Sequence, residues 1–153
     1  MDFLVERALQ SAPTEDDFAH VSQANIKVIG VGGAGNNMVG WLYKKGIKGA
    51  EIIATNTDYQ HLQITGADKK FLIGKDCTRG LGCGGFPNKG AEAAQESLTS
   101  LKEALKEADM VFVCAGMGGG TGTGAAPVVA QVAKDTGAIV IGTVTMPFNI
   151  ERA

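Results

Sequence analysis

A glycine-rich segment follows an apolar run in the last third of the chain. Residues 116–124 read GMGGGTGTG, and they come directly after MVFVCA at residues 110–115. Inside a regular element, glycine costs roughly 0.5 to 1 kcal/mol relative to alanine, so this composition needs a physical reason. The segment is either a slack linker or a loop that another group approaches closely. The pattern of the remaining chain decides between the two.

Apolar runs alternate with helix-like segments from Ile26 onwards. The pattern predicts strands at residues 26–31, 51–56, 69–74, 110–115 and 138–145, and helices at residues 37–46, 91–105 and 124–137. The last two strands are continuous apolar runs, which is typical of strands buried on both faces. The sequence therefore predicts an α/β fold, with a Rossmann-like, mostly parallel sheet and helices on both faces.

Length and composition indicate one soluble domain. The chain has 153 residues, of which 44% are hydrophobic and 20% charged. We expect an N-terminal arm at residues 1–24 and one folded domain at residues 25–153. A net charge of −2 gives no reason to expect nucleic acid as a partner, and no apolar run is long enough for membrane insertion. Cys77, Cys83 and Cys114 form no disulfide or CxxC pattern, which favours the cytoplasm.

Glycines gather after three of the predicted strands, at residues 31–37, 80–85 and 116–124. In a parallel sheet these positions lie at the carboxyl ends of the strands, where ligands bind. A phosphate needs close approach of backbone N–H groups, and it gains from the positive end of a helix. One such loop alone is usually a tight turn. Three of them at one edge of the sheet favour a polyphosphate site.

Two known phosphate motifs were compared with these loops. Gly30, Gly32 and Gly35 satisfy GxGxxG, and Asp58 follows about twenty residues later, as in dinucleotide-binding domains. A nicotinamide-dependent oxidoreductase is therefore an alternative, although it gives no role to residues 116–124. The Walker pattern GxxxxGK[ST] is absent from the chain. The phosphates would consequently be held without a P-loop lysine.

Several segments together resemble one family. GGGTGTG at residues 118–124, VGGAGNN at 31–37, ATNTD at 54–58, TRGLGCGG at 78–85 and VTMPFNIE at 144–151 resemble the FtsZ branch of the tubulin/FtsZ GTPases, in order and in spacing. The resemblance implies a tubulin-like fold that binds GTP or GDP. It also implies part of a self-assembling, cytoplasmic GTPase of the cell-division ring, with other FtsZ subunits and division-site proteins as partners of the intact protein.

The resemblance implies a role for each matching position. The first phosphate loop would be Gly32, Gly33, Ala34, Gly35, Asn36 and Asn37. The signature loop around the α- and β-phosphates would be Gly118, Gly119, Gly120, Thr121, Gly122, Thr123 and Gly124. Asn56 and Asp58 would lie beneath the phosphates and a cation such as Mg²⁺, Cys83 and Gly84 near the γ-phosphate, and Glu151 near the ribose. No residue is assigned as a metal ligand.

Alternatives remain for some of these positions. Asp58 could cap a turn, which is a common role of aspartate, and Glu151 could be a solvated acid. Cys83 stands where the family usually has alanine, and Phe86 replaces a polar residue. Either difference could alter nucleotide sensing or only local packing.

The resemblance also implies an active site shared between two subunits. In the family, an acidic loop from the neighbouring subunit polarises the attacking water. That loop would lie beyond residue 153, as would the C-terminal part of the domain. We therefore expect no catalytic residue within these residues, and neither hydrolysis nor polymerisation by them alone. A fragment that caps FtsZ filaments is a further alternative.

Overall fold

The computed structural model describes residues 23–151, which form a five-stranded parallel β-sheet covered by helices. The predicted N-terminal arm therefore lies almost entirely outside the described residues. The strands are β1 (Ile26–Val31), β2 (Ala50–Asn56), β3 (Lys69–Leu72), β4 (Met110–Gly116) and β5 (Ile139–Thr145). The helices are α3 (Gly32–Lys45), α4 (Tyr59–Ile64), α5 (Lys75–Thr78), α6 (Pro87–Glu96), α7 (Leu98–Leu105), α8 (Thr121–Asp135) and the short 3-10 turn η1 (Asn149–Glu151).

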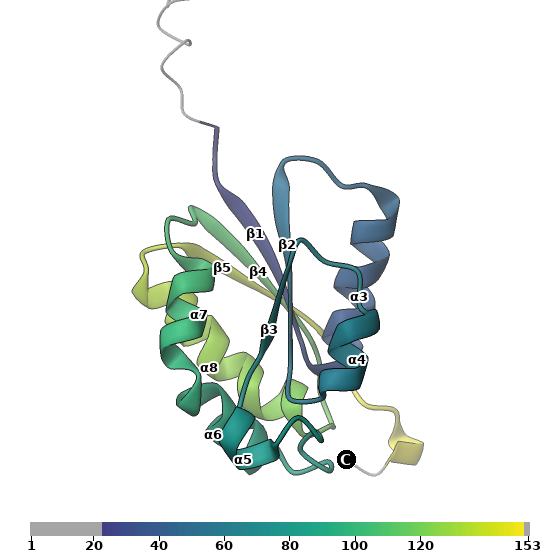
Figure 1. Cartoon of the computed structure of the whole chain (residues 1–153). Helices are drawn as coiled ribbons and strands as arrows, with labels where there is room; N and C mark the ends of the chain where they lie inside the picture. Colours follow the sequence, from purple (N-terminus) through teal and green to yellow (C-terminus); the bar gives the residue numbers. More distant parts are fainter. Residues whose placement is uncertain (1–22, 152–153) are drawn as a thin grey trace, which may run out of the picture.

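All strand pairs are parallel, and the order across the sheet is β3-β2-β1-β4-β5. Helices α3 and α4 cover one face of the sheet, and α6, α7 and α8 cover the other, as Figure 1 shows. The predicted α/β fold, with a parallel sheet and helices on both faces, is confirmed. None of the helices in residues 23–151 has the length and hydropathy needed to cross a lipid bilayer.

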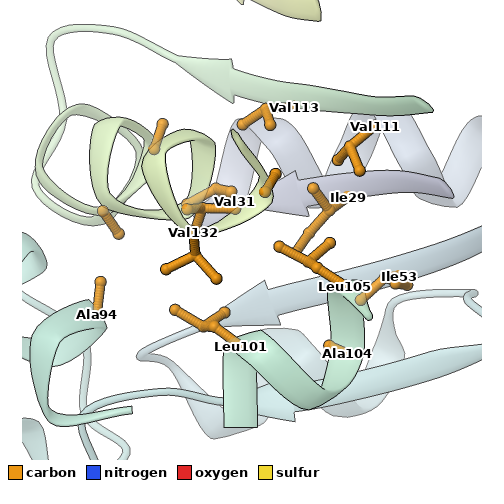
Figure 2. Packing of buried hydrophobic residues seen from close by; sticks show 14 of the residues in the cluster. Ile29, Val31, Ile53, Ala94, Leu101, Ala104, Leu105, Val111, Val113 and Val132 are labelled. Atoms are coloured by element: carbon orange, nitrogen blue, oxygen red, sulfur yellow. The ribbon is translucent and has the colours of Figure 1, made fainter. Parts of the chain in front are cut away.

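The larger hydrophobic core lies between the sheet and α6–α8. Ile29 and Val111 from the central strands meet Leu101 and Leu105 from α7, and all four side chains are fully buried (Figure 2). A smaller cluster on the other face joins Val39 of α3 to Ile52 of β2. Both faces of the central strands are therefore buried, which explains why β4 reads as a continuous apolar run.

The predicted helix at residues 91–105 is instead two helices that meet at Ser97. The Ser97 hydroxyl accepts a hydrogen bond from the backbone N–H of Gly74 at 3.0 Å, and the Glu96 carboxylate accepts from the N–H groups of Asp76 and Cys77. These contacts hold the junction of the two helices against α5, the short helix that follows β3 in the chain. Periodicity alone could not show this break, because the apolar spacing continues through it.

The expectation that β5 is buried on both faces is wrong. Of its seven residues only Val140 is partly covered, and the others are exposed, including Ile139 at 62% and Val144 at 48%. β5 is the last strand of the sheet described here and pairs only with β4. An apolar run therefore indicated the strand correctly but not its position at an edge.

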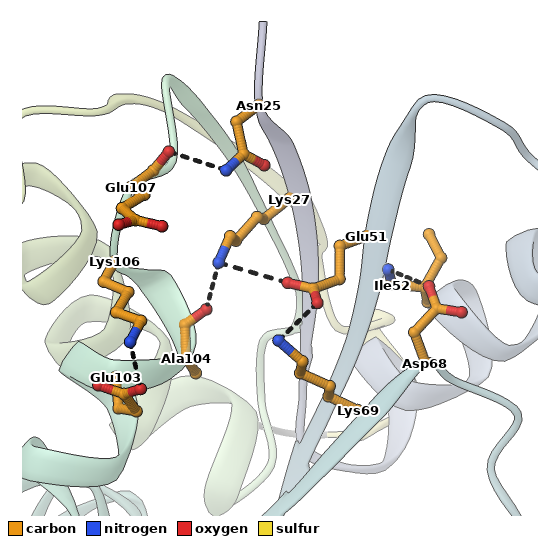
Figure 3. Close-up of polar contacts among 10 residues, drawn as sticks. All are labelled: Asn25, Lys27, Glu51, Ile52, Asp68, Lys69, Glu103, Ala104, Lys106 and Glu107. Atoms are coloured by element: carbon orange, nitrogen blue, oxygen red, sulfur yellow. Dashed lines mark hydrogen bonds and ion pairs between the residues drawn. The ribbon is translucent and has the colours of Figure 1, made fainter.

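A buried cation connects three strands at the amino-terminal end of the sheet (Figure 3). The Lys27 side chain in β1 is only 7% exposed; its Nζ lies 3.3 Å from a carboxylate oxygen of Glu51 in β2 and donates to the Ala104 carbonyl at 2.9 Å. Glu51 also pairs with Lys69 of β3 at 2.7 Å. Burial opposes ionisation of Glu51, but its hydrogen bonds and charge interactions with Lys69 and Lys27 outweigh this and lower its pKa.

Candidate functional site

The strand order reverses direction between β1 and β4. The chain continues from β1 to β2 and β3 on one side, and from β4 to β5 on the other. Ligands of open α/β sheets bind at such a switch point, beyond the carboxyl ends of the strands. A cavity of about 490 Å³ lies here, lined by Val31, Gly33, Ala34, Gly116, Met117, Gly119, Gly120, Thr121, Gly122, Thr145, Met146 and Phe148.

Two helices begin at this cavity without a side-chain cap. Val31 stands before α3 and Gly120 before α8, and neither side chain bonds the first-turn N–H groups. Such N–H groups and the helix dipoles provide a positive potential. None of the described residues that line the cavity carries a charge. Any attraction of this cavity for an anion would therefore come from backbone groups.

The predicted helices at residues 37–46 and 124–137 both start earlier than expected. α3 begins at Gly32 and α8 at Thr121, so much of each glycine-rich segment forms the first helical turn. Glycine has low helix propensity, which hid these starts in the sequence. The earlier starts bring the N–H groups of the glycine segments to the cavity as helix N-termini.

The glycines of these segments serve two different purposes. A Cβ on Gly32 would lie 2.8 Å from the Gly122 nitrogen, and one on Gly122 would lie 2.5 Å from the Gly116 oxygen. These glycines allow the two loops to pack backbone against backbone. By contrast, a Cβ on Gly33 or Gly119 would meet nothing within 4 Å, although both line the cavity. Packing within the protein therefore does not require glycine at these two positions. Close approach of a ligand to the backbone would be a reason for glycine there.

Three side chains join the loops beside the cavity. The hydroxyl oxygens of Thr57 and Thr121 are 2.7 Å apart, and the Cys83 sulfur lies 3.4 Å from each of them. Thr57 is fully buried and Cys83 is 4% exposed. Thr57 follows β2, Cys83 belongs to the loop before α6, and Thr121 begins α8. Their contacts fix the position of the first residue of α8.

Asn36, Asn56 and Asp58 hold the backbone around the site. With its amide nitrogen facing both carbonyls, the buried Asn36 donates to the oxygens of Gly30 and Thr55. The Asn56 side-chain oxygen accepts from the N–H groups of Thr57 and Asp58. The Asp58 carboxylate accepts from the His61 N–H at 3.0 Å and caps α4. None of the three lines the 490 Å³ cavity.

The dinucleotide alternative needs the acidic residue after β2 to face the ligand. Because Asp58 is engaged as the cap of α4 and lies outside the cavity lining, the structure gives no support to that interpretation. The contacts of Asp58 are those of a helix cap, and its expected place beneath the phosphates and a cation stays a prediction.

Other predicted positions surround the cavity or lie apart from it. The Thr123 hydroxyl accepts from the Gly118 N–H at 2.9 Å and orders the loop. Gly35 packs against the Cys114 carbonyl, and Gly124 against the Pro87 carbonyl. Gly84 is exposed with a positive φ of 59°, in the same loop as Cys83.

Two predicted positions remain, Asn37 and Glu151. Asn37 is exposed and faces a separate groove between α3 and α4. Glu151 ends η1, and its side chain is outside the described part of the chain.

Sequence reasoning did not assign several residues that contribute to the site. Thr145, at the end of β5, and Met146 and Phe148, just after it, line the cavity, although they belong to the segment VTMPFNIE that carried the resemblance. Thr57 stands between Asn56 and Asp58 and was passed over. The position of Thr57 between two assigned residues was the only sequence signal for a role at the site. Its partner Thr121 is 64 residues away in sequence, so their contact could not be predicted.

The described residues offer no group of three or more His, Cys, Asp or Glu side chains that could hold a metal ion.

Comparison with known proteins identifies the family. The model described as "Tubulin/FtsZ family, GTPase domain" matches residues 25–153. Cell division protein FtsZ 2 of Methanocaldococcus jannaschii is 58% identical over 98% of this chain and 40% of its own length. FtsZ 2 of Haloferax volcanii is 53% identical over 97% of the chain and 37% of its own length. This chain thus spans about two fifths of these relatives.

Solved structures agree with this result. An empty FtsZ dimer from M. jannaschii matches with a TM-score of 0.85 and 50% identity, over 91% of this chain and 42% of that one. CetZ from Methanosaeta thermophila, at 22% identity and a TM-score of 0.67, covers 82% of this chain and 37% of its own and shares the fold. With the glycine loops at the switch point of a parallel sheet, these matches show that the chain belongs to the tubulin/FtsZ family and carries sequence of its GTPase domain.

Proposed function

We propose that the cavity at the ends of β1 and β4 binds GDP or GTP through its phosphates. The observation that carries this proposal is the pair of uncapped helix N-termini that meet there, with Gly33 and Gly119 left open toward the cavity. A diphosphate placed against α3 and α8 would receive backbone N–H donors from both helices. The family membership supports guanine as the base.

The other predicted positions take indirect roles in this proposal. Asn36 and Asn56 shape the two backbone turns, Thr121 presents a hydroxyl to the phosphates, and Cys83 with Gly84 brings the loop before α6 beside them. Glu151 remains the proposed ribose contact. Mg²⁺, where present, would accompany the phosphates, since the described residues supply no carboxylate cluster.

Hydrolysis would need groups from outside this cavity. Phosphoryl transfer depends on a group that orients the attacking water, and among the described residues no acid, base or cation lines the cavity. We propose that the missing group comes from a neighbouring FtsZ subunit, and that these residues alone bind nucleotide without turning it over. The existence of a related FtsZ dimer structure supports contact between subunits. The intact protein would act in the cytoplasm in cell division, with other division-site proteins.

The first test is to denature the purified chain and to chromatograph the nucleotide that it releases. We expect the released nucleotide to be GDP or GTP. In titrations, we expect the chain to bind GDP more tightly than ADP. Release of an adenine dinucleotide would overturn the guanine assignment. A chain that retains nothing and binds neither nucleotide would overturn the site itself.

A second test addresses hydrolysis. The rate of GTP hydrolysis with the chain present should equal the rate in buffer without protein, at every protein concentration. Turnover that rises with concentration would show that copies of this chain complete the active site for one another, against the proposal.

A further inference from the structure

A groove of about 300 Å³ lies between α3 and α4, on the side of the molecule away from β5. Trp41 and Ile64 are among its lining residues, and they are 59% and 82% exposed. Lys44 and His61 also line it. An exposed tryptophan beside an exposed isoleucine is an apolar patch of the kind that marks an interaction surface. We call these four residues the α3–α4 patch.

The α3 side of the patch is basic. Lys44, Lys45 and Lys48 are all exposed, and the Lys45 ammonium lies 5.1 Å from the centre of the Trp41 ring. Residues 32–50 contain no acidic residue. An occupant should therefore combine apolar side chains with negative charge.

The N-terminal segment of the same chain has that chemistry. Residues 1–22 carry Phe3, Leu4, Val5 and Phe18, and their acidic residues are Asp2, Glu6, Glu15, Asp16 and Asp17 against the single basic residue Arg7. The described chain begins at Gln23, whose side-chain nitrogen lies 4.0 Å from the Cβ position of Gly49. Gly49 belongs to the turn that follows α3. The segment therefore leaves the domain beside the turn that joins α3 to β2.

We propose that residues 1–22 dock in cis on the α3–α4 patch, with their acidic residues near Lys44, Lys45 and Lys48. Trp41 lies five residues before Gly46, which is about 8 Å along the helix, and the turn from Gly46 to Gly49 adds three residues. This span is well within the reach of residues 1–22 in an extended conformation. Charge distinguishes this patch from the exposed apolar side chains of β5 and the residues after it. Residues 138–151 contain no lysine or arginine, whereas residues 44–48 contain three lysines, so the α3–α4 patch is the better match for an acidic segment.

Trp41 is the chain's single tryptophan and reports on the patch directly. The test compares the full chain with the triple variant E15Q/D16N/D17N by Trp41 emission and by quenching with acrylamide, a neutral quencher. Undocking should shift the emission to longer wavelength and increase quenching, and high salt should do the same to the parent chain. A matched control, E92Q/E103Q/D135N, removes three acidic charges from other elements and should leave both readouts unchanged.

Zero-length carboxyl-to-amine crosslinking supplies a second readout. The proposal expects crosslinks within one chain from Glu15, Asp16 or Asp17 to Lys44, Lys45 or Lys48, and their loss in the triple variant. Unchanged Trp41 emission together with crosslinks to lysines on other elements would overturn it. Crosslinks that appear only in a covalent dimer would assign the patch to a second copy and would likewise overturn docking in cis.

Discussion

At the scale of single residues, glycines that look alike in the sequence differ in what surrounds them. Gly35 is held against the Cys114 carbonyl, whereas a Cβ on Gly33, two residues earlier in the same helix, would meet open space. Sequence reasoning placed both in one phosphate loop, because composition cannot distinguish a glycine needed for packing from one needed for a ligand. The distinction depends on atoms from β4, about 80 residues away in sequence.

This difference predicts opposite effects of alanine at the two positions. Gly35→Ala should lower the free energy of unfolding by about 2 kcal/mol, because the added methyl overpacks a backbone contact. Gly33→Ala should leave stability unchanged or raise it by up to about 1 kcal/mol, as alanine favours the helix. The same Gly33→Ala change should weaken GDP binding about tenfold, equivalent to about 1.4 kcal/mol.

Urea denaturation and nucleotide titration measure the two quantities separately. Each variant serves as the control of the other, because both replace glycine by alanine in the first turn of α3. Full nucleotide affinity in a stable Gly33→Ala chain would show that the bound phosphates do not approach the Cβ position of Gly33, against the close approach proposed here.

Thr57 supports a second prediction at this scale. Thr57→Val replaces a fully buried hydroxyl by a methyl group of similar size, and it removes the 2.7 Å contact with Thr121. We expect a loss of about 1 kcal/mol in the free energy of unfolding. GDP binding should weaken as well, because the Thr121 hydroxyl loses the contact that fixes it.

Thr57→Ser keeps the hydroxyl and should restore nucleotide affinity even where it costs some stability. Isothermal titration with GDP, run beside thermal unfolding, separates these effects. Equal affinity in the valine and serine variants would show that the contact between the two threonines has no influence on the phosphate site.

At the scale of elements, the Lys27–Glu51–Lys69 group joins three strands and α7 at the end of the sheet opposite the cavity. The pKa of Glu51 is lowered in the folded protein because the contacts with Lys69 and Lys27 outweigh the effect of burial. A carboxyl group with a lowered folded pKa stabilises the protein above its unfolded pKa of about 4.3. That contribution is lost as the pH falls through the lower, folded value.

The variant Glu51→Gln should therefore be less stable than the parent by about 2 kcal/mol at pH 7. The difference should shrink as the pH falls below about 4, since the parent carboxylate is then protonated too. Urea denaturation of both proteins between pH 3 and pH 7, on the order of one measurement per pH unit, gives the difference in their free energies of unfolding as a function of pH. Glu92→Gln, at an exposed position of α6, should show no such profile. A constant difference across this range would exclude the ionised Glu51 as its source.

At the scale of the whole molecule, the sequence was sufficient to predict the fold, and it also pointed to the carboxyl ends of the strands as the place of the candidate site. Alternation of apolar strands and helices predicted the parallel layers, and the glycine positions predicted the loops at the carboxyl ends of β1 and β4. The break at Ser97 and the exposed β5 were not predictable, because each depends on a contact, or the lack of one, between distant elements. The helix starts at Gly32 and Thr121 were missed because glycine is a poor helix former.

The two edges of the sheet differ in a way that predicts how the whole chain behaves in solution. β3 has four residues and carries exposed Lys69 and Lys70, whereas β5 has seven uncharged residues. Charge on an edge strand opposes pairing with another chain, and a long apolar edge without it promotes such pairing. We therefore expect concentration-dependent self-association through β5.

Ile139→Lys, at a position 62% exposed in β5, should reduce that association. Sedimentation velocity over a hundredfold range of concentration, on the order of micromolar to a tenth millimolar, would show a smaller shift toward larger species. The matched control is Ile64→Lys, which makes the same change at an 82% exposed residue of α4, a helix and not an edge strand. Equal reduction by both variants would assign the effect to net charge, and reduction by Ile64→Lys alone would place the association on the α3–α4 side. Only a response confined to Ile139→Lys identifies the open edge of the sheet as the contact.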